Sequence, residues 1–312
     1  MFNNLATLLQ EEIESTLGLI TEKTGLYDLA RESCTKACLV EVGSPVKPWH
    51  LLPLIICQTV SGGHNRAVPA AAALLFLKSA AEVFDDIEDD DSPDSLFATR
   101  GRAVATNVAT TLLILAEIAV TRLKDRGVRE EVVVQVMNQI NSYHLEACIG
   151  QHLDISVHIK RSVTEDEYLK IIKLKSAKIT ECACHVGALI GDASPELVDI
   201  YSSFGYLLGM ASQIENDVQD FISGGASVKS QINLPLIYAL HNVDDETACV
   251  LKKSLKNGTS SGAKTVQEIL FQSGSIQYAL IKANVFQQQA AAALFKAEAT
   301  GLNTDMLRTF VD

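Results

Sequence analysis

Apolar residues recur at helical spacing along almost the whole chain, and this pattern limits the folds that the chain can adopt. The first apolar stripe consists of Leu5, Leu8, Leu9, Ile13, Leu17 and Ile20, with Glu11, Glu12 and Glu14 off it. Such a stripe lies on one face of a helix. Residues 132–159 and 165–190 follow the same period, whereas strict alternation of apolar and polar residues is hard to find. We therefore predict an all-α protein that forms one large helical domain over residues 1–312.

The charge balance excludes one class of partner. The chain has 38 acidic and 26 basic residues, which give a formal net charge of −12. Nucleic-acid binders need a basic patch or stripe, so we expect no nucleic-acid partner. Hydrophobic residues make up 47% of the chain, too many for a disordered protein.

The distribution of apolar and cysteine residues predicts a cytoplasmic protein without a transmembrane segment. The apolar stretch 67–77 is interrupted by Lys78, and a second one, from Ala103, is interrupted by Glu117. We expect neither to be long enough to cross a bilayer. The first residues lack the basic and then apolar regions of a secretory signal. The seven cysteines show no metal-ligand spacing, so we expect reduced thiols.

A dense acidic cluster follows directly on an apolar helix at residues 85–91. Asp85 and Asp89 are four residues apart, and Asp86 and Asp89 are three apart, so all three can project from one helical face. Like charges at these spacings repel, and a divalent cation would reverse the sign of that interaction. Magnesium prefers oxygen ligands and often takes one or two carboxylates together with substrate phosphates. For this cluster alone, a solvated helix end is the alternative interpretation.

A second acidic cluster, at residues 213–220, favours the metal interpretation. It also follows an apolar helical stretch, residues 204–211, and Asp217 and Asp220 share a helical face. Two such clusters on two apolar helices indicate a metal–diphosphate site formed by both.

Both clusters resemble the aspartate motifs of the trans-isoprenyl diphosphate synthase superfamily. The first has the form Asp85-Asp86-x-x-Asp89, and the second has the form Gln213-x-x-Asn216-Asp217-x-x-Asp220. Other family-like motifs occur in the expected order: Gly62-Gly63-His64 with Arg66 and Pro69, Gly150-Gln151-x-x-Asp154, Lys175-Ser176-Ala177 and Leu234-Pro235. The resemblance covers roughly residues 60–240. It implies a helical bundle of the isoprenoid synthase (class I terpenoid synthase) type.

Several residues depart from the family pattern. His64 stands where the family usually has lysine, and Asn216 replaces the first aspartate of the second motif. Arg100 lies farther from Asp85 than usual, and Lys229 is the nearest candidate for a lysine missing before Leu234-Pro235. This short pattern looks most similar to the branch that holds peptide-modifying prenyltransferases of the competence-pheromone (ComQ) type.

The resemblance implies roles for individual residues. Magnesium ions, about two to three bound together with the substrate diphosphate, would be held by Asp85, Asp86, Asp89, Asn216, Asp217 and Asp220. The catalytic set would be Asp85, Asp86, Asp89, Lys175, Gln213 and Asp217. Substrate diphosphates would contact His64, Arg66, Arg100, Gln151, Lys175, Gln213 and Lys229. The apolar wall that shields the prenyl chain would include Leu77, Ala80 and Ala81.

The implied reaction is ionisation of an allylic diphosphate, followed by attack of a π-nucleophile on the carbocation. The first hypothesis is elongation with isopentenyl diphosphate. In the family that the motifs resemble, bulk just before the first aspartate stops the growing chain. Ala80 and Ala81 are small and Leu77 lies two turns deeper, which would permit a product of about C15–C25. The alternatives are ComQ-like transfer to a peptide tryptophan, a class I terpene cyclase, and a non-catalytic subunit of a heteromeric synthase. The resemblance also implies isoprenoid biosynthesis and a homodimer.

Overall fold

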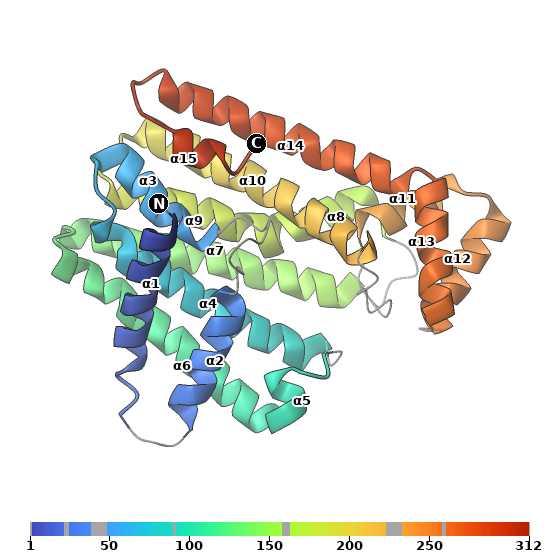
Figure 1. The fold of residues 1–312 in the computed structure, drawn as a ribbon, viewed down its shortest axis with the longest axis horizontal. Coiled ribbons are helices and arrows are strands. Elements are labelled where there is room, and N and C mark those ends of the chain that lie inside the picture. The colour runs from blue at the N-terminus through green and yellow to red at the C-terminus, as the bar shows by residue number, and fades with distance from the viewer. Residues whose placement is uncertain are drawn as a thin grey trace. The chain divides into compact units, whose positions relative to one another are not determined.

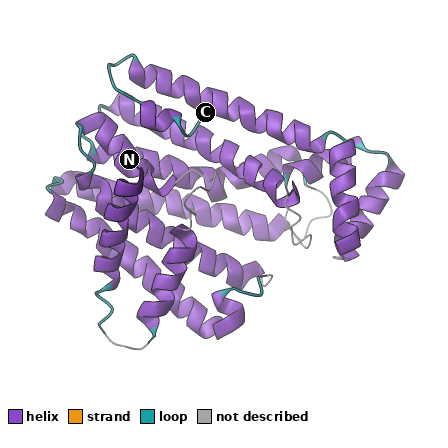
Figure 2. Ribbon diagram, viewed as in Figure 1, coloured by secondary structure: helices purple, strands orange, loops and turns teal. Residues whose placement is uncertain are grey.

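The computed structural model describes residues 2–21, 25–38, 49–89, 92–157, 163–222, 233–257 and 260–311. Within these ranges the chain forms helices and turns and no strand (Figure 2). The prediction of an all-α protein is confirmed. The six cysteines whose side chains are described are free thiols, as expected.

The helices follow one another with short connections. The first half of the chain contains α1 (Phe2–Leu17), α2 (Leu26–Cys38), η1 (Trp49–Leu51), α3 (Leu52–Ser61), η2 (Asn65–Ala67), α4 (Val68–Asp89), α5 (Leu96–Arg100), α6 (Arg102–Thr121), η3 (Arg122–Arg126) and α7 (Glu130–Val157). The second half contains α8 (Glu165–Ile172), η4 (Lys173–Ala177), α9 (Lys178–Ile190), α10 (Pro195–Ile222), α11 (Leu234–Asn242), α12 (Asp245–Asn257), α13 (Ser260–Gln272), α14 (Ser275–Glu298) and α15 (Asp305–Arg308).

The chain divides into two compact units. Unit 1 comprises Met1–Asn141, Cys182–Tyr201 and Ala297–Phe310, and unit 2 comprises Ser142–Glu181, Ser202–Lys296 and Val311–Asp312. The helices α7, α9, α10 and α14 contribute residues to both units. That the whole chain behaves as one domain stays a prediction.

The core of unit 1 is built around α4. Ten consecutive residues of this helix, Val68 to Leu77, are buried, as expected for a helix that is apolar on every side. It packs against α1, α2, α3 and most extensively against α6 (Figure 1). The helix α4 is therefore central to unit 1. The outer face of α6 is exposed, with Ile114 56% accessible.

Two helical stretches, Asn65–Asp89 and Arg102–Arg126, are long and apolar enough to cross a membrane by length and composition alone. This corrects the expectation that Lys78 and Glu117 leave them too short, because the helices continue past both residues. In the first stretch 78% of the most apolar window is buried, as in the core helix of a soluble protein, and in the second 44% is buried. The two helices are therefore weak evidence for a membrane segment.

One residue of α1 that the sequence places off the apolar stripe is buried. Glu12 is 6% exposed and accepts hydrogen bonds from Arg122 Nη1 at 2.8 Å and Arg126 Nη2 at 2.7 Å. The Arg122 guanidinium also donates to Thr16 Oγ1 at 2.6 Å. Burial of the carboxylate is thus offset by two charge-assisted pairs, which join α1 to η3.

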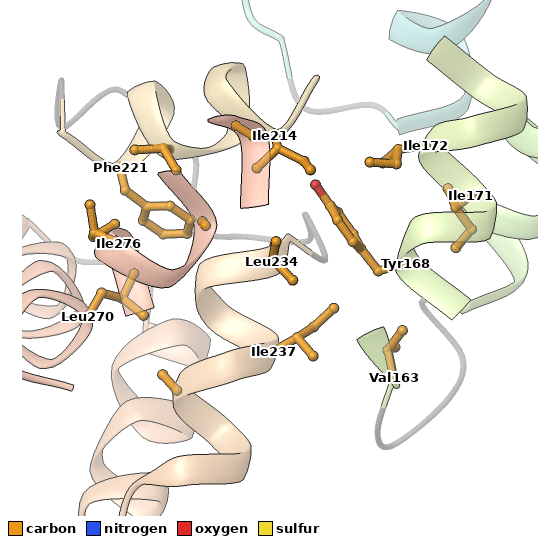
Figure 3. Close-up of a cluster of buried hydrophobic side chains, with 14 of the residues drawn as sticks. Val163, Tyr168, Ile171, Ile172, Ile214, Phe221, Leu234, Ile237, Leu270 and Ile276 are labelled. Carbon is orange, nitrogen blue, oxygen red and sulfur yellow. The ribbon is translucent and has the colours of Figure 1, made fainter. Parts of the chain in front are cut away.

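The core of unit 2 lies between α8, α10, α11, α13 and α14. Tyr168 and Leu234 are among its fully buried side chains, and Figure 3 shows the Tyr168 hydroxyl directed toward Ile214 of α10. A capping box between Thr164 and Glu167 starts α8, because the side chain of each residue accepts from the backbone N–H of the other.

The Glu12 pairs can be tested by truncation. Glu12→Ala removes the buried carboxylate that pairs with Arg122 and leaves this guanidinium without it. We therefore expect the free energy of unfolding to fall by about 2–3 kcal/mol. The neighbouring Glu11 is exposed, and Glu11→Ala should change the free energy by less than about 0.5 kcal/mol. Urea unfolding of both variants measures the difference, and equal effects would show that the buried pairs add nothing.

Candidate functional site

The first acidic cluster lies on the last turns of α4, in unit 1. Asp85, Asp86 and Asp89 are half-buried there, and Asp90 and Asp91 lie outside the described residues. Val83 and Ile87 on the same helix pack against Ala105 and Ala109 of α6. This apolar contact fixes the orientation of the helix end and leaves the carboxylates on its remaining surface. The three aspartates thus lie at a helix end whose apolar side packs against α6.

The proposed cavity wall lies further back along α4. Leu77 is 8% exposed and Ala80 is fully buried, whereas Ala81 is exposed. Ala80 and Ala81 thus differ in environment, although both are small and adjacent.

The basic residues near the first cluster have different surroundings. Arg100 is the last residue of α5 and is exposed. Its neighbour Arg102, which has no role in the sequence-based prediction, lies over the Phe97 ring at 5.1 Å from the centroid. A cation at this distance interacts favourably with the face of an aromatic ring.

The glycine-rich motif before α4 is held by polar contacts within unit 1. His64 Nδ1 lies 3.2 Å from Gln58 Oε1. Arg66 Nη1 donates to Asp192 Oδ2 at 2.9 Å, and Arg129 Nη2 donates to Asp192 Oδ1 at 3.0 Å. These two arginines lower the pKa of Asp192. The Arg66 guanidinium is therefore already engaged by a carboxylate.

The second acidic cluster lies on α10, in unit 2. Asp217 is 8% exposed, and its carboxylate accepts from Tyr168 Oη at 2.5 Å and Gln213 Nε2 at 2.9 Å. Burial, together with the nearby charges of Asp220 and Asp154, raises the pKa of Asp217 to about 7, against the effect of both hydrogen bonds. Asp220 and Asn216 are exposed. The structure thus brings Gln213 and Asp217 together, as their four-residue spacing predicts.

Lys175 lies on η4, a π-helical turn between α8 and α9. Its Nζ donates to Asp154 Oδ2 of α7 at 2.8 Å. Gln151 is half-buried one turn earlier on α7. The remaining basic candidate, Lys229, lies outside the described residues.

Two residues of this part of unit 2 were not assigned a site role from the sequence. Tyr168 occupies an apolar position of a helical stripe, so nothing in the sequence indicates that its hydroxyl meets Asp217. Asp154 belongs to the Gly150-Gln151-x-x-Asp154 motif, and its position in this motif is the sequence signal that could have assigned it to the site. The structure brings it within ion-pair distance of Lys175.

The donor set fits magnesium. Among the described residues, no group of three or more His, Cys, Asp or Glu side chains is placed so that it could hold a metal ion by itself. Magnesium does not require one, because it usually takes one or two carboxylates and completes its shell with water and substrate phosphates. Asp85 and Asp89, and separately the buried Asp217, supply the hard oxygen donors that such binding needs. Whether both clusters meet at one substrate stays a prediction.

The raised pKa of Asp217 makes metal-free stability depend on pH. The folded carboxyl keeps a proton that the unfolded one releases between its ordinary pKa of 3.8 and about 7. This stabilisation is complete below 3.8 and is lost as the pH rises through 7. At pH 8 without magnesium, Asp217→Asn should therefore increase the free energy of unfolding by about 1–4 kcal/mol. At pH 4 the two proteins should unfold alike. Thermal unfolding at both pH values measures this, and a less stable variant at pH 8 would contradict it.

Comparisons with known proteins agree with the motif order. A family model described as polyprenyl synthetase matches residues 50–271. The short chain isoprenyl diphosphate synthase of Methanothermobacter thermautotrophicus is 26% identical over 273 residues, 82% of this chain and 82% of that protein. The tryptophan prenyltransferase ComQ of Bacillus subtilis is 26% identical over 248 residues, 77% of this chain and 79% of that protein.

Solved structures agree in fold. The crystal structure of geranylgeranyl pyrophosphate synthetase from Pyrococcus horikoshii superposes with a TM-score of 0.84 at 26% identity, covering 99% of this chain and 96% of that one. This confirms the expected isoprenoid synthase fold. Because the family model also matches well over half of the chain, the protein belongs to the polyprenyl synthetase family and is a trans-prenyltransferase.

Proposed function

We propose that this enzyme is a magnesium-dependent prenyltransferase that ionises an allylic diphosphate and condenses it with isopentenyl diphosphate. The product would be a prenyl diphosphate of about C15–C25. The observation that carries the proposal is the intact first acidic cluster at the rigid end of α4. Three carboxylates at these spacings repel one another, and a bound divalent cation would reverse the sign of that interaction.

The chain's own residues supply binding and orientation. When bound, magnesium supplies Lewis-acid stabilisation of the negative charge that develops on the leaving diphosphate. Asp85, Asp89 and Asp217 offer the oxygen ligands, and Asp86, Asp220 and Asn216 are the remaining candidates. Tyr168 and Gln213 hold the Asp217 carboxylate in one orientation, as groups around a metal ligand commonly do.

Lys175 adds a positive charge for the diphosphate. Its ammonium has three donors, and the ion pair with Asp154 uses one of them in the substrate-free protein. The proposed diphosphate would lie within reach of this ammonium, and Asp154 limits where the ammonium can go. Lys175 therefore acts as an oriented point charge.

Peptide prenylation is the second candidate, and one observation favours it. The resemblance assigns the glycine-rich motif to the second diphosphate, yet Arg66 is engaged by Asp192, and Arg129 shares that carboxylate. A weakened site for isopentenyl diphosphate suits an enzyme whose acceptor is a peptide tryptophan. The similarity to ComQ points in the same direction.

The resemblance also suggests a homodimer in the cytoplasm. Leu145 and Ile149 on α7 are 64% and 48% exposed, which suits a helix that packs against a second copy. Sedimentation equilibrium would measure the oligomeric state.

The two candidate functions differ in their acceptor. We expect the purified protein with magnesium, farnesyl diphosphate and labelled isopentenyl diphosphate to form longer diphosphates. Turnover of the allylic diphosphate only when a tryptophan-containing peptide is added would assign the second candidate.

Asp85→Ala and Asp89→Ala should each lower kcat at least about 100-fold, because each removes a proposed metal ligand. Glu88→Ala, at an exposed position between them, is the matched control, and retained activity in both aspartate variants would refute the metal assignment.

Product length depends on the wall of α4. Ala81→Phe places bulk one turn before Asp85, so we expect shorter products than the wild type gives. Chromatography of the dephosphorylated products measures the shift. An unchanged product distribution would exclude this face of α4 from the prenyl cavity.

A further inference from the structure

The turn that carries Lys175 has an unusual backbone. Residues Lys173–Ala177 form a π-helical turn, in which each hydrogen bond spans one more residue than in an α-helix. Such turns are rare, occur mostly as single bulges inside α-helices and are frequent at functional sites. Here the turn interrupts an otherwise continuous helical run from α8 into α9.

A glycine of α7 closes on one side of this turn. A Cβ atom at Gly150 would overlap the backbone nitrogen of Lys175 and lie 2.8 Å from the carbonyl carbon and the Cβ of Leu174. Two of these three atoms belong to the backbone, so they cannot turn aside as a flexible side chain can. Only glycine permits this approach of α7.

A glycine of α10 closes on the opposite end of the turn. A Cβ atom at Gly209 would lie 2.7 Å from Ala177 Cα and 3.1 Å from both the Ala177 carbonyl oxygen and Thr180 Cβ. Gly150 and Gly209 are both buried. The π-turn thus lies between α7 and α10, which approach it closely at two glycines that have no side chain.

The same stretch of α7 supplies the partner of the lysine. Asp154 follows Gly150 by four residues, one helical turn along the same face, and it accepts the 2.8 Å ion pair from Lys175. We infer that Gly150 and Gly209 are positioning residues: by admitting the π-turn they direct the Lys175 ammonium toward Asp154 and the substrate diphosphate. This inference rests on the proposed function, which assigns Lys175 to the diphosphate.

Packing alone is the competing explanation, and a double-mutant cycle separates the two. The probe is inorganic pyrophosphate with magnesium, whose dissociation constant is measured by calorimetry on the full chain. We expect Lys175→Met, Gly150→Ala and Gly209→Ala each to weaken binding about tenfold. If Gly150 acts through Lys175, Gly150→Ala should weaken pyrophosphate binding only slightly further in the Lys175→Met background. Gly18→Ala is the control, since a Cβ there meets nothing closer than 3.4 Å.

The inference is overturned if Gly150→Ala weakens binding equally in both backgrounds, or if folded Gly150→Ala binds as the wild type does. If Gly150→Ala does not fold, the deletion of Ser176 tests the inference instead. That deletion removes the extra residue of the π-turn and leaves an α-helical register on both sides. We expect it to keep the helical circular dichroism and to weaken pyrophosphate about tenfold. Unchanged affinity in the deletion variant overturns the inference.

Failure of the proposed function would look different. Lys175→Met would then bind pyrophosphate as the wild type does. Weakening by Lys175→Met, without weakening by the deletion or by the folded glycine variants, would overturn the positioning role alone.

Discussion

The carboxylates that end the apolar helices α4 and α10 are the constraint on which the rest of the structure depends. Asp217 is buried and hydrogen-bonded from two sides, so its negative charge is costly without a cation. Asp85, Asp86 and Asp89 carry like charges at spacings that repel, on a helix end whose apolar side packs against α6. Under the proposed function, magnesium and a diphosphate would offset both costs.

The acidic composition bears on how an anionic diphosphate could bind. A net charge of −12 would repel an anionic diphosphate, and oriented lysine and arginine side chains offset only part of it. Two of the basic site candidates are paired with carboxylates, Lys175 with Asp154 and Arg66 with Asp192. Under the proposed function, substrate binding therefore depends on divalent cations more than on these two basic residues.

The sequence predicts the helices well and the long-range contacts poorly. The apolar period identifies α1, α7 and the run from α8 to α9, and the four-residue spacing predicts the contact of Gln213 with Asp217. The site roles of Asp85 and Asp89 stay predictions. The burial of Glu12 is not predictable, because Arg122 and Arg126 lie more than 100 residues away in the chain. The hydrogen bond of Tyr168 to Asp217 also depends on tertiary packing. The π-turn is missed because the helical period on either side of it is unbroken.

The central claim is that magnesium mediates the contact between the carboxylates and the diphosphate. The most direct measurement is the affinity of the full-length protein for inorganic pyrophosphate, by calorimetry, with magnesium and with the metal removed by a chelator. We predict micromolar to millimolar binding, of about 4–8 kcal/mol, only when magnesium is present. Equal affinity in the presence and absence of magnesium would contradict the claim.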